Sequence, residues 1–157
     1  MRFGLAFVAI ILLAACTPTM ADPATPISIT LERSPCFGFC PDYSVTITGD
    51  GAVTYHGGRF TRVNGEQHAT ASREDVAHLV QMIHDADFFN LRDHYRAQVT
   101  DLPTYRVTVV EGERSKTVED YMGQSVGMPP AVSTIEQEID RVAGTERWVP
   151  GGGPGAK

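Results

Sequence analysis

The sequence predicts an α+β fold in which a mostly antiparallel sheet of about five to seven strands and two amphipathic helices form two layers. Three observations predict this fold: short segments alternate apolar and polar residues, glycine-containing turns separate several of them, and two longer segments repeat apolar residues at helical spacing. Consecutive hairpins favour antiparallel pairing, and a helix with a single apolar stripe covers part of one sheet face. A chain of 157 residues suffices for one such domain.

The first half of the domain is predicted to be built from strands. Alternation and turn signals place these strands over residues 27–32, 43–48, 52–56, 59–63 and 66–71. Between the second and third strands, Asp50-Gly51 is typical of a tight hairpin turn with two positive φ angles. Asn64-Gly65 is the same kind of signal and predicts a second hairpin.

Two segments have the apolar period of helices. The first helix follows a Ser72 cap and ends near Ala86, and the second opens at Pro129-Pro130 and ends at Gly144. Their apolar stripes consist of Val76, Leu79, Val80 and Ile83, and of Val132, Ile135, Ile139 and Val142. Between the helices, residues 92–103 have no period and are predicted to be a loop, which is followed by strands over 104–110 and 115–121.

The first fifteen residues are typical of an export signal. Arg2 precedes an apolar run of about a dozen residues, which is shorter than the ~20 residues that cross a bilayer as a helix. Leu13-Ala14-Ala15-Cys16 follows directly and resembles the lipobox read by bacterial signal peptidase II. We therefore expect lipid on Cys16 as the first mature residue, and the alternative is ordinary cleavage after Ala21.

These signals divide the chain into four parts. Residues 1–15 are the signal peptide, and residues 16–26, which contain three prolines, form a lipidated tether. Residues 27–149 form the single α+β domain. Residues 150–157 are predicted to be a flexible tail, because this glycine-rich stretch cannot pack.

Charge excludes some partners. The formal net charge is -6, and no cluster of Lys and Arg occurs in the sequence. Such a domain is a poor candidate for binding nucleic acid or anionic lipid surfaces, so we expect contact with the membrane only through the lipid on Cys16.

Two cysteines, Cys36 and Cys40, lie between the first two predicted strands. In an oxidising compartment a disulfide is the expected outcome, and it would close a loop of about five residues and stabilise the domain by roughly 2 kcal/mol. The alternative is a thiol site, because the run from Cys36 to Pro41 resembles the copper-binding loop of the Sco copper chaperones, and thiolates suit Cu(I). In that family the loop leads into a helix, whereas here residues 43–48 alternate as a strand.

Other residues give no sign of catalysis or metal binding. The histidines have none of the paired spacings of a zinc site, and the acidic residues after the first helix do not have EF-hand spacing. No Ser or Cys has an evident histidine partner. We therefore expect no catalytic residues, no metal site and no cofactor.

Several motifs are distributed over most of residues 27–149. They are the segments 31–43, 49–51, 86–89, 100–103, 116–121 and 139–141. Together they resemble an exported bacterial family known as domain of unknown function 6438. The resemblance implies that Cys36 and Cys40 belong to the family's strand-corner motif and that many members are envelope lipoproteins. It implies no activity.

The expected function is that of a non-catalytic lipoprotein domain in the bacterial cell envelope, facing the periplasm, that binds an unknown envelope protein or ligand. Thr17 follows the anchor cysteine, and resemblance to enteric sorting signals favours the outer membrane. The alternatives are a periplasmic hydrolase inhibitor, and a copper or thiol-redox protein that uses Cys36 and Cys40.

Overall fold

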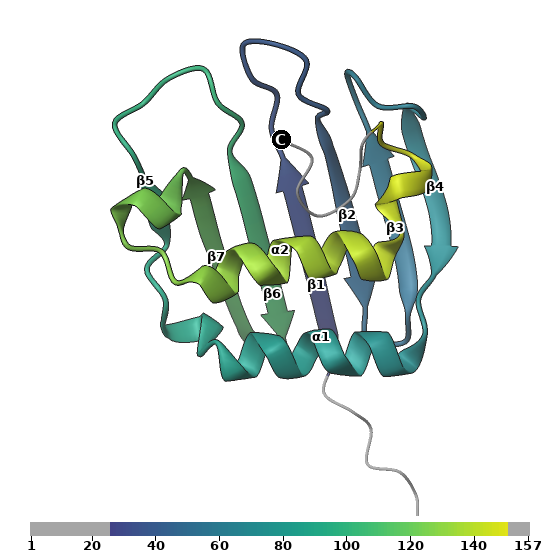
Figure 1. Ribbon diagram of the computed structural model, residues 1–157. Helices are drawn as coiled ribbons and strands as arrows, with labels where there is room; N and C mark the ends of the chain where they lie inside the picture. The colour runs from purple at the N-terminus through teal and green to yellow at the C-terminus, as the bar shows by residue number, and fades with distance from the viewer. Residues whose placement is uncertain (1–25, 151–157) are drawn as a thin grey trace, which may run out of the picture.

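The computed structural model describes residues 26–150, which form one sheet with two α-helices packed against it (Figure 1). The strands are β1 (Ile27–Arg33), β2 (Tyr43–Thr48), β3 (Ala52–Gly57), β4 (Gly65–Thr70), β5 (His94–Arg96), β6 (Tyr105–Glu111) and β7 (Arg114–Tyr121). The helices are α1 (Arg73–Asp85) and α2 (Pro130–Ala143), and short 3-10 turns span Phe88–Asn90, Gly123–Val126 and Thr145–Arg147. The fold class predicted from the sequence is confirmed.

The seven strands lie in the order β4-β3-β2-β1-β6-β7-β5. All neighbours are antiparallel except β5, which runs parallel to β7. The first strand of the domain is therefore the middle strand of the sheet. Its Leu31 lies opposite Val45 of β2 on one side and Val107 of β6 on the other, so β1 has a hydrogen-bonded neighbour along both edges.

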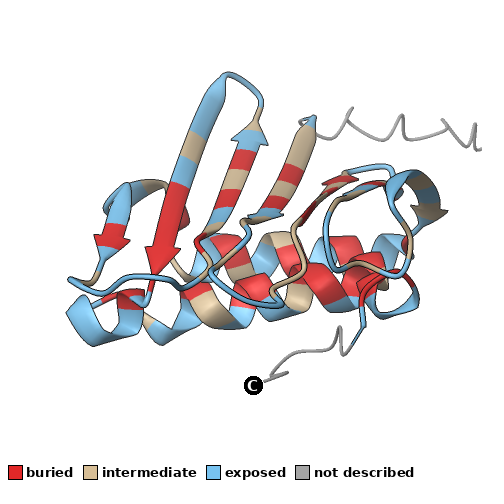
Figure 2. Cartoon of the chain, turned by 90° about the horizontal axis from the view of Figure 1, so that it is seen from above, coloured by how far each residue is buried: buried red, intermediate tan, exposed pale blue. Residues whose placement is uncertain are grey.

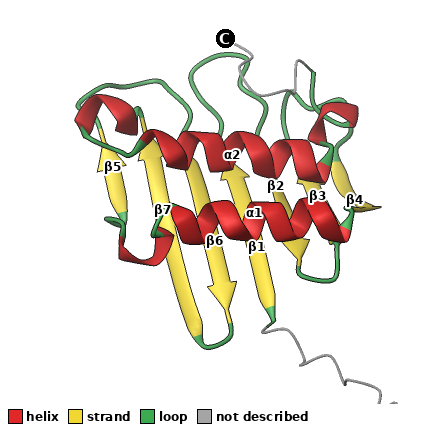
Figure 3. Ribbon diagram, turned by 60° about the horizontal axis from the view of Figure 1, so that its bottom comes forward, coloured by secondary structure: helices red, strands yellow, loops and turns green. Residues whose placement is uncertain are grey.

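Both helices cover the same face of the sheet (Figure 3). Alternate residues of the strands point toward the helices and are buried, and the helices contribute their apolar stripes, as the burial colours show in Figure 2. The largest fully buried side chains include Tyr55, Phe88, Ile29, Leu31, Ile47, Leu79, Ile83, Ile135 and Ile139. The core thus lies between the sheet and the helix pair.

The opposite face of the sheet is polar. Register aligns Thr108, Thr30, Thr46 and Thr54 across four neighbouring strands. The Thr30 and Thr46 hydroxyls are 2.9 Å apart and hydrogen-bonded. Short Ser and Thr side chains make this a face that tolerates solvent, as is typical of antiparallel sheets with one covered side.

The helix boundaries follow the sequence signals. Ser72 caps α1, and its hydroxyl oxygen accepts a hydrogen bond from the Asp75 backbone N–H at 3.0 Å. Gly144 ends α2 with a φ of 65°, a left-handed conformation that glycine adopts without strain. Both helix predictions are confirmed.

Residues 59–63, which were predicted to form a strand, are instead part of a loop between β3 and β4. The backbone N–H groups of Arg62 and Val63 donate to the Trp148 carbonyl at 2.8 and 3.2 Å, so the segment after α2 occupies the bonds that a strand would need. The Thr61 hydroxyl also donates to the Gly58 carbonyl at 2.8 Å. As a result β4 pairs directly with β3.

Two further details of the sheet differ from expectation. Residues 94–96, within the predicted loop, form the short edge strand β5 beside β7, and three residues are too few to show a period. The turn after β2 has only one positive φ, at Gly51, rather than two. Asp50 contributes its side chain instead: the carboxylate accepts hydrogen bonds from the Thr48 hydroxyl at 2.5 Å and the Ala52 N–H at 3.2 Å.

We predict that Leu79→Ala destabilises the domain by about 2–5 kcal/mol, because Leu79 is fully buried beneath the sheet and its loss leaves a cavity. The neighbouring substitution His78→Ala, on the exposed side of α1, should change stability by less than ~0.5 kcal/mol. Chemical denaturation of both variants measures the difference. Equal effects would contradict the burial of Leu79.

Candidate functional site

Three loops lie side by side at one end of the sheet, where β1, β3 and β5 end (Figure 1). They are residues 34–42, 58–64 and 97–104. The Phe37 N–H donates to the Asp101 carbonyl at 3.2 Å, and the Asp42 N–H donates to the Arg59 carbonyl at 3.1 Å. The loop of residues 34–42, called here the aromatic loop, is thus bonded to a neighbouring loop on each side.

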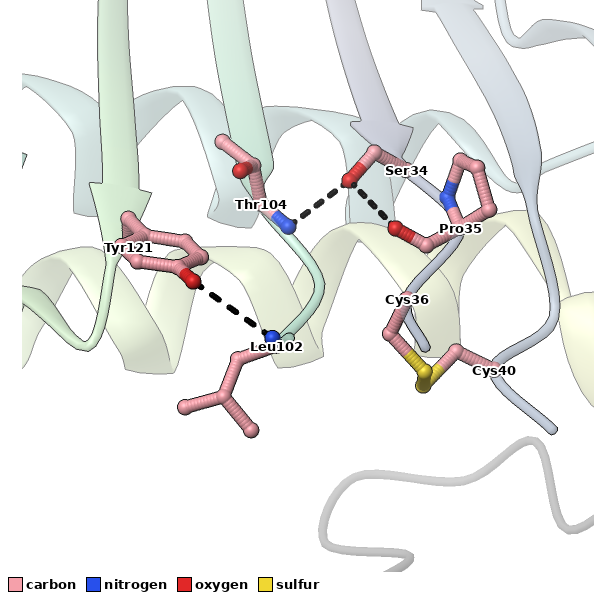
Figure 4. Close-up of a disulfide and its surroundings, with 7 residues drawn as sticks. All are labelled: Ser34, Pro35, Cys36, Cys40, Leu102, Thr104 and Tyr121. Carbon is pink, nitrogen blue, oxygen red and sulfur yellow. Dashed lines mark hydrogen bonds between the residues drawn. A yellow bond between two sulfur atoms is a disulfide. The ribbon is translucent and has the colours of Figure 1, made fainter. Parts of the chain in front are cut away.

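A disulfide closes the aromatic loop (Figure 4). It joins Cys36 and Cys40, whose Cα atoms are 5.6 Å apart. At the base of the loop, Ser34 and Thr104 are joined by two hydrogen bonds: the Ser34 N–H donates to the Thr104 carbonyl at 2.9 Å, and the Thr104 N–H donates to the Ser34 hydroxyl at 2.8 Å. These contacts fix the path of the chain between β1 and β2.

The loop presents two phenylalanines to solvent. Phe37 is 88% exposed and Phe39 is 89% exposed, and both lie between the bridged cysteines. Phe39 packs against Phe60 of the adjacent loop in a T-shaped arrangement, with ring centroids 5.2 Å apart. Leu102, from the loop on the other side, is also exposed. Apolar side chains from all three loops therefore share one end of the domain.

A row of inward-facing polar side chains lies at the same end of the sheet. In register across β2, β1, β6 and β7 the row is Tyr43, Arg33, Tyr105 and Asp120. The Arg33 guanidinium stacks on the Tyr105 ring, 4.1 Å from its centroid. This row ends the apolar core and faces α2.

Asp140 of α2 is the partner of this row. Its carboxylate accepts hydrogen bonds from Arg33 at 2.5 Å and from the Tyr43 hydroxyl at 2.7 Å. The Thr145 hydroxyl donates to the same carboxylate at 2.8 Å. Burial and the nearby charge of Asp140 raise the pKa of Tyr43, so its phenol stays protonated and remains a donor.

Glu136 lies one turn before Asp140 and is only 3% exposed. Its Oε1 atom has no hydrogen-bond partner among the described residues. Burial, followed by the negative charge of Asp120, raises the pKa of Glu136 to about 8, although Arg33 opposes the shift. Burial also raises the pKa of Asp120, whose carboxylate accepts a hydrogen bond from the Gly123 N–H at 2.6 Å.

The structure describes two of the three site residues that were predicted from the sequence. Cys16 lies outside the described residues, whereas Cys36 and Cys40 form the disulfide. The sequence analysis missed Arg33, Glu136 and Asp140, because residues distant in the chain give no local spacing signal. Two signs were available: Arg33 is a polar residue at an inward position of an alternating strand, and Arg33 and Asp140 both lie in motif segments, 31–43 and 139–141.

Three histidines lie close to glutamate side chains. His56 and His68 both approach Glu66, at 3.4 and 2.9 Å from its carboxylate, and His84 lies 2.9 Å from Glu111. Within residues 26–150, no group of three or more His, Cys, Asp or Glu side chains could hold a metal ion. No helix in the same residues is long and apolar enough to cross a membrane.

The raised pKa of Glu136 predicts a pH-dependent stability. The pKa of Glu136 in the folded protein, about 8, lies above the ordinary value of 4.5. The neutral carboxyl therefore makes its full contribution to stability below pH ~4.5, and that contribution is lost as the pH rises toward 8. Glu136→Gln removes this loss, so at pH 7 the variant should be more stable than the parent by about 1–3 kcal/mol.

Urea denaturation of both proteins between pH 5 and 8 measures this difference, which should grow with pH. Glu113→Gln, at an exposed turn, is the control and should show no such growth. A constant difference between Glu136→Gln and the parent over that range would contradict the burial of a titrating carboxyl.

Comparison with models of protein families gives a match. No curated protein matches the chain. A family defined as a domain of unknown function, DUF6438, matches residues 27–143, which run from the first residue of β1 to the last residue of α2. That range includes the aromatic loop and the polar row, and it covers most of the sequence. The chain therefore belongs to the DUF6438 family.

Proposed function

We propose that this chain is a non-catalytic binding module of the bacterial cell envelope, held by lipid on Cys16, and that the aromatic loop recognises its partner. The observation that carries the proposal is the exposure of Phe37 and Phe39, at 88% and 89%, on a loop closed by a disulfide. Burying each ring in a partner is worth about 1.5–3 kcal/mol.

The loop is pre-organised for binding. The disulfide, the bonds to Asp101 and Arg59, and the Ser34 pair at its base hold the backbone before any partner arrives. Ordering a flexible loop costs binding free energy, and a loop that is already ordered avoids much of that cost. Exposed apolar side chains on a fixed backbone are typical of an interaction surface.

The position of the loop supports a partner on the side away from the anchor. The chain enters the domain at Ile27, at one end of β1, and the aromatic loop begins after Arg33, at the other end. A strand of this length spans roughly 20 Å. Lipid on Cys16 would hold the first end toward the membrane and direct Phe37 and Phe39 outward.

Local charges favour an apolar pocket on a protein as the partner. The aromatic loop and its neighbour at 97–104 carry one acidic residue each, and residues 58–64 carry two arginines, so the three loops have no net charge. A partner that is recognised here gains mainly from burial of the rings. A hydrolase with an apolar cleft belongs to this class, so the inhibitor alternative would use the same surface.

We predict that the mature protein begins at Cys16 and carries diacylglyceryl and amide-linked acyl chains. Two anchoring signals give stable membrane residence, whereas one acyl chain gives only marginal binding. Intact mass spectrometry of the protein purified from its own membranes measures this. An unmodified chain that starts at Asp22 would exclude the lipid anchor while leaving the binding surface open to test.

We predict that a photoreactive phenylalanine analogue at position 37 or 39 crosslinks to one discrete protein in living cells. The same analogue at Val110 is the matched control and should give no such product. Val110 is an exposed apolar position that lies opposite Ser28, at the other end of β1 from the aromatic loop. In the protein without the analogue, Phe37→Ala and Phe39→Ala should reduce co-purification of that protein by at least ~10-fold. Crosslinking that is equal at position 110 would overturn the proposal.

A further inference from the structure

Two exposed arginines lie beside the aromatic loop. Arg59 and Arg62 belong to the neighbouring loop of residues 58–64, which also carries Phe60. The Arg59 guanidinium lies 5.8 Å from the centroid of the Phe60 ring, and this ring packs against Phe39 of the aromatic loop. We propose that the protein recognised by the aromatic loop presents an acidic surface here, with carboxylates opposite Arg59 and Arg62 beside its apolar pocket.

The two arginines differ from most other cationic side chains of the domain, because no acidic side chain in residues 26–150 pairs with them. The Arg and Lys side chains that do form ion pairs there are Arg33, Arg96, Arg106, Arg114, Lys116 and Arg141. Arg92 and Arg147 donate to backbone carbonyls instead. Among the described arginines, only Arg59, Arg62 and Arg73 make neither kind of bond, and the first two share one loop.

A guanidinium without an internal partner keeps its charge and its donors available to another molecule. Arginine stays protonated at any physiological pH, and its planar fork of N–H groups matches a carboxylate in a bidentate pair. Aromatic residues and arginine are also enriched in the buried parts of protein interfaces. The exposed rings and the two arginines together therefore have the composition of a binding surface for an acidic protein.

The acidic residues of the three loops do not neutralise the arginines at the surface. Asp42 is only half-exposed, its Oδ1 atom is buried, and its carboxylate packs so closely against Gly58 that a larger side chain there would meet it. Asp101 is exposed, but it lies on the other side of the aromatic loop, where its carbonyl accepts the Phe37 N–H. The three loops sum to no net charge, yet their positive charges gather on the Phe60 side.

The backbone that carries the two arginines is fixed. The Arg59 carbonyl accepts the Asp42 N–H at 3.1 Å, and the Arg62 N–H donates to the Trp148 carbonyl at 2.8 Å. Between them Phe60 has a φ of 60°, a left-handed conformation that bulky residues rarely adopt. Such conformations cluster at functional sites, where the surrounding contacts maintain them. The charges are thus positioned before binding, which reduces the cost of ordering this loop.

The test uses the full chain in living cells, with the photoreactive phenylalanine analogue at position 37, so that residues 58–64 keep their native contacts. We expect Arg59→Glu and Arg62→Glu each to lower the yield of the crosslinked protein at least ~5-fold, because like charges then face each other. Arg59→Lys keeps the charge and should retain most of the yield. Arg73→Glu is the matched control, at the start of α1, and should crosslink like the parent.

Two further measurements separate charge from folding. Thermal unfolding of the purified variants should match that of the parent, because the substituted side chains are exposed. In membranes prepared from the same cells, crosslinking of the parent should fall as NaCl rises from about 0.05 to 0.5 M, since salt screens exposed charges. Crosslinking of Arg59→Glu should change much less over that range.

This inference rests on the proposed function, and the experiment distinguishes the two failures. If the parent gives no discrete crosslinked protein, both are overturned. A discrete product with the same yield in the parent, Arg59→Glu and Arg62→Glu would overturn the acidic partner surface alone, and so would an equal loss in Arg73→Glu. An adduct with the mass of a phospholipid, dependent on the same arginines, would replace the acidic protein by a lipid headgroup and overturn the inference.

Discussion

The Asp140 carboxylate holds the two layers of this protein together at their polar end. It lies on α2 and receives hydrogen bonds from Arg33 of β1 and Tyr43 of β2, which are strands at the centre of the sheet. Removing one partner from a buried ion pair typically costs 3–5 kcal/mol, because the other charge stays buried without compensation. The position of α2 over β1 and β2, and therefore the support beneath the aromatic loop, depends on this carboxylate.

The polar row and the aromatic loop are adjacent, because the loop joins Arg33 at the end of β1 to Tyr43 at the start of β2. Strands β1 and β2 must be joined above the core, and Arg33, Tyr43 and Asp140 satisfy one another where the apolar packing ends. None of the residues 34–42 belongs to the apolar core, and the phenylalanines of the loop point outward. Glu136 is the exception, because its Oε1 atom has no hydrogen-bond partner among the described residues. Burial and the nearby charge of Asp120 favour its neutral form.

Local signals predicted the parts of the fold that local sequence determines. Ser72 and Gly144 delimit helices through their own conformational preferences, and Ile29, Leu31, Val45 and Ile47 alternate because one face of their strands is buried. Residues 59–63 misled the prediction because Trp148, far away in sequence, takes their hydrogen bonds. The cysteine loop was visible in the sequence, but the grouping of Arg33 with Asp140, and of His56 with His68, depends on strand register and helix placement.

The central position of β1 has a mechanical consequence. In the proposed function, a pull between the chain entering at Ile27 and a partner on the aromatic loop would run along β1, from one end of the strand to the other. Since β1 is already extended, its covalent backbone carries that load, and the hydrogen bonds to β2 and β6 need not break. The disulfide keeps residues 37–39 out of the extension. One extended strand would thus transmit tension between the proposed anchor and the proposed partner without unfolding of the sheet.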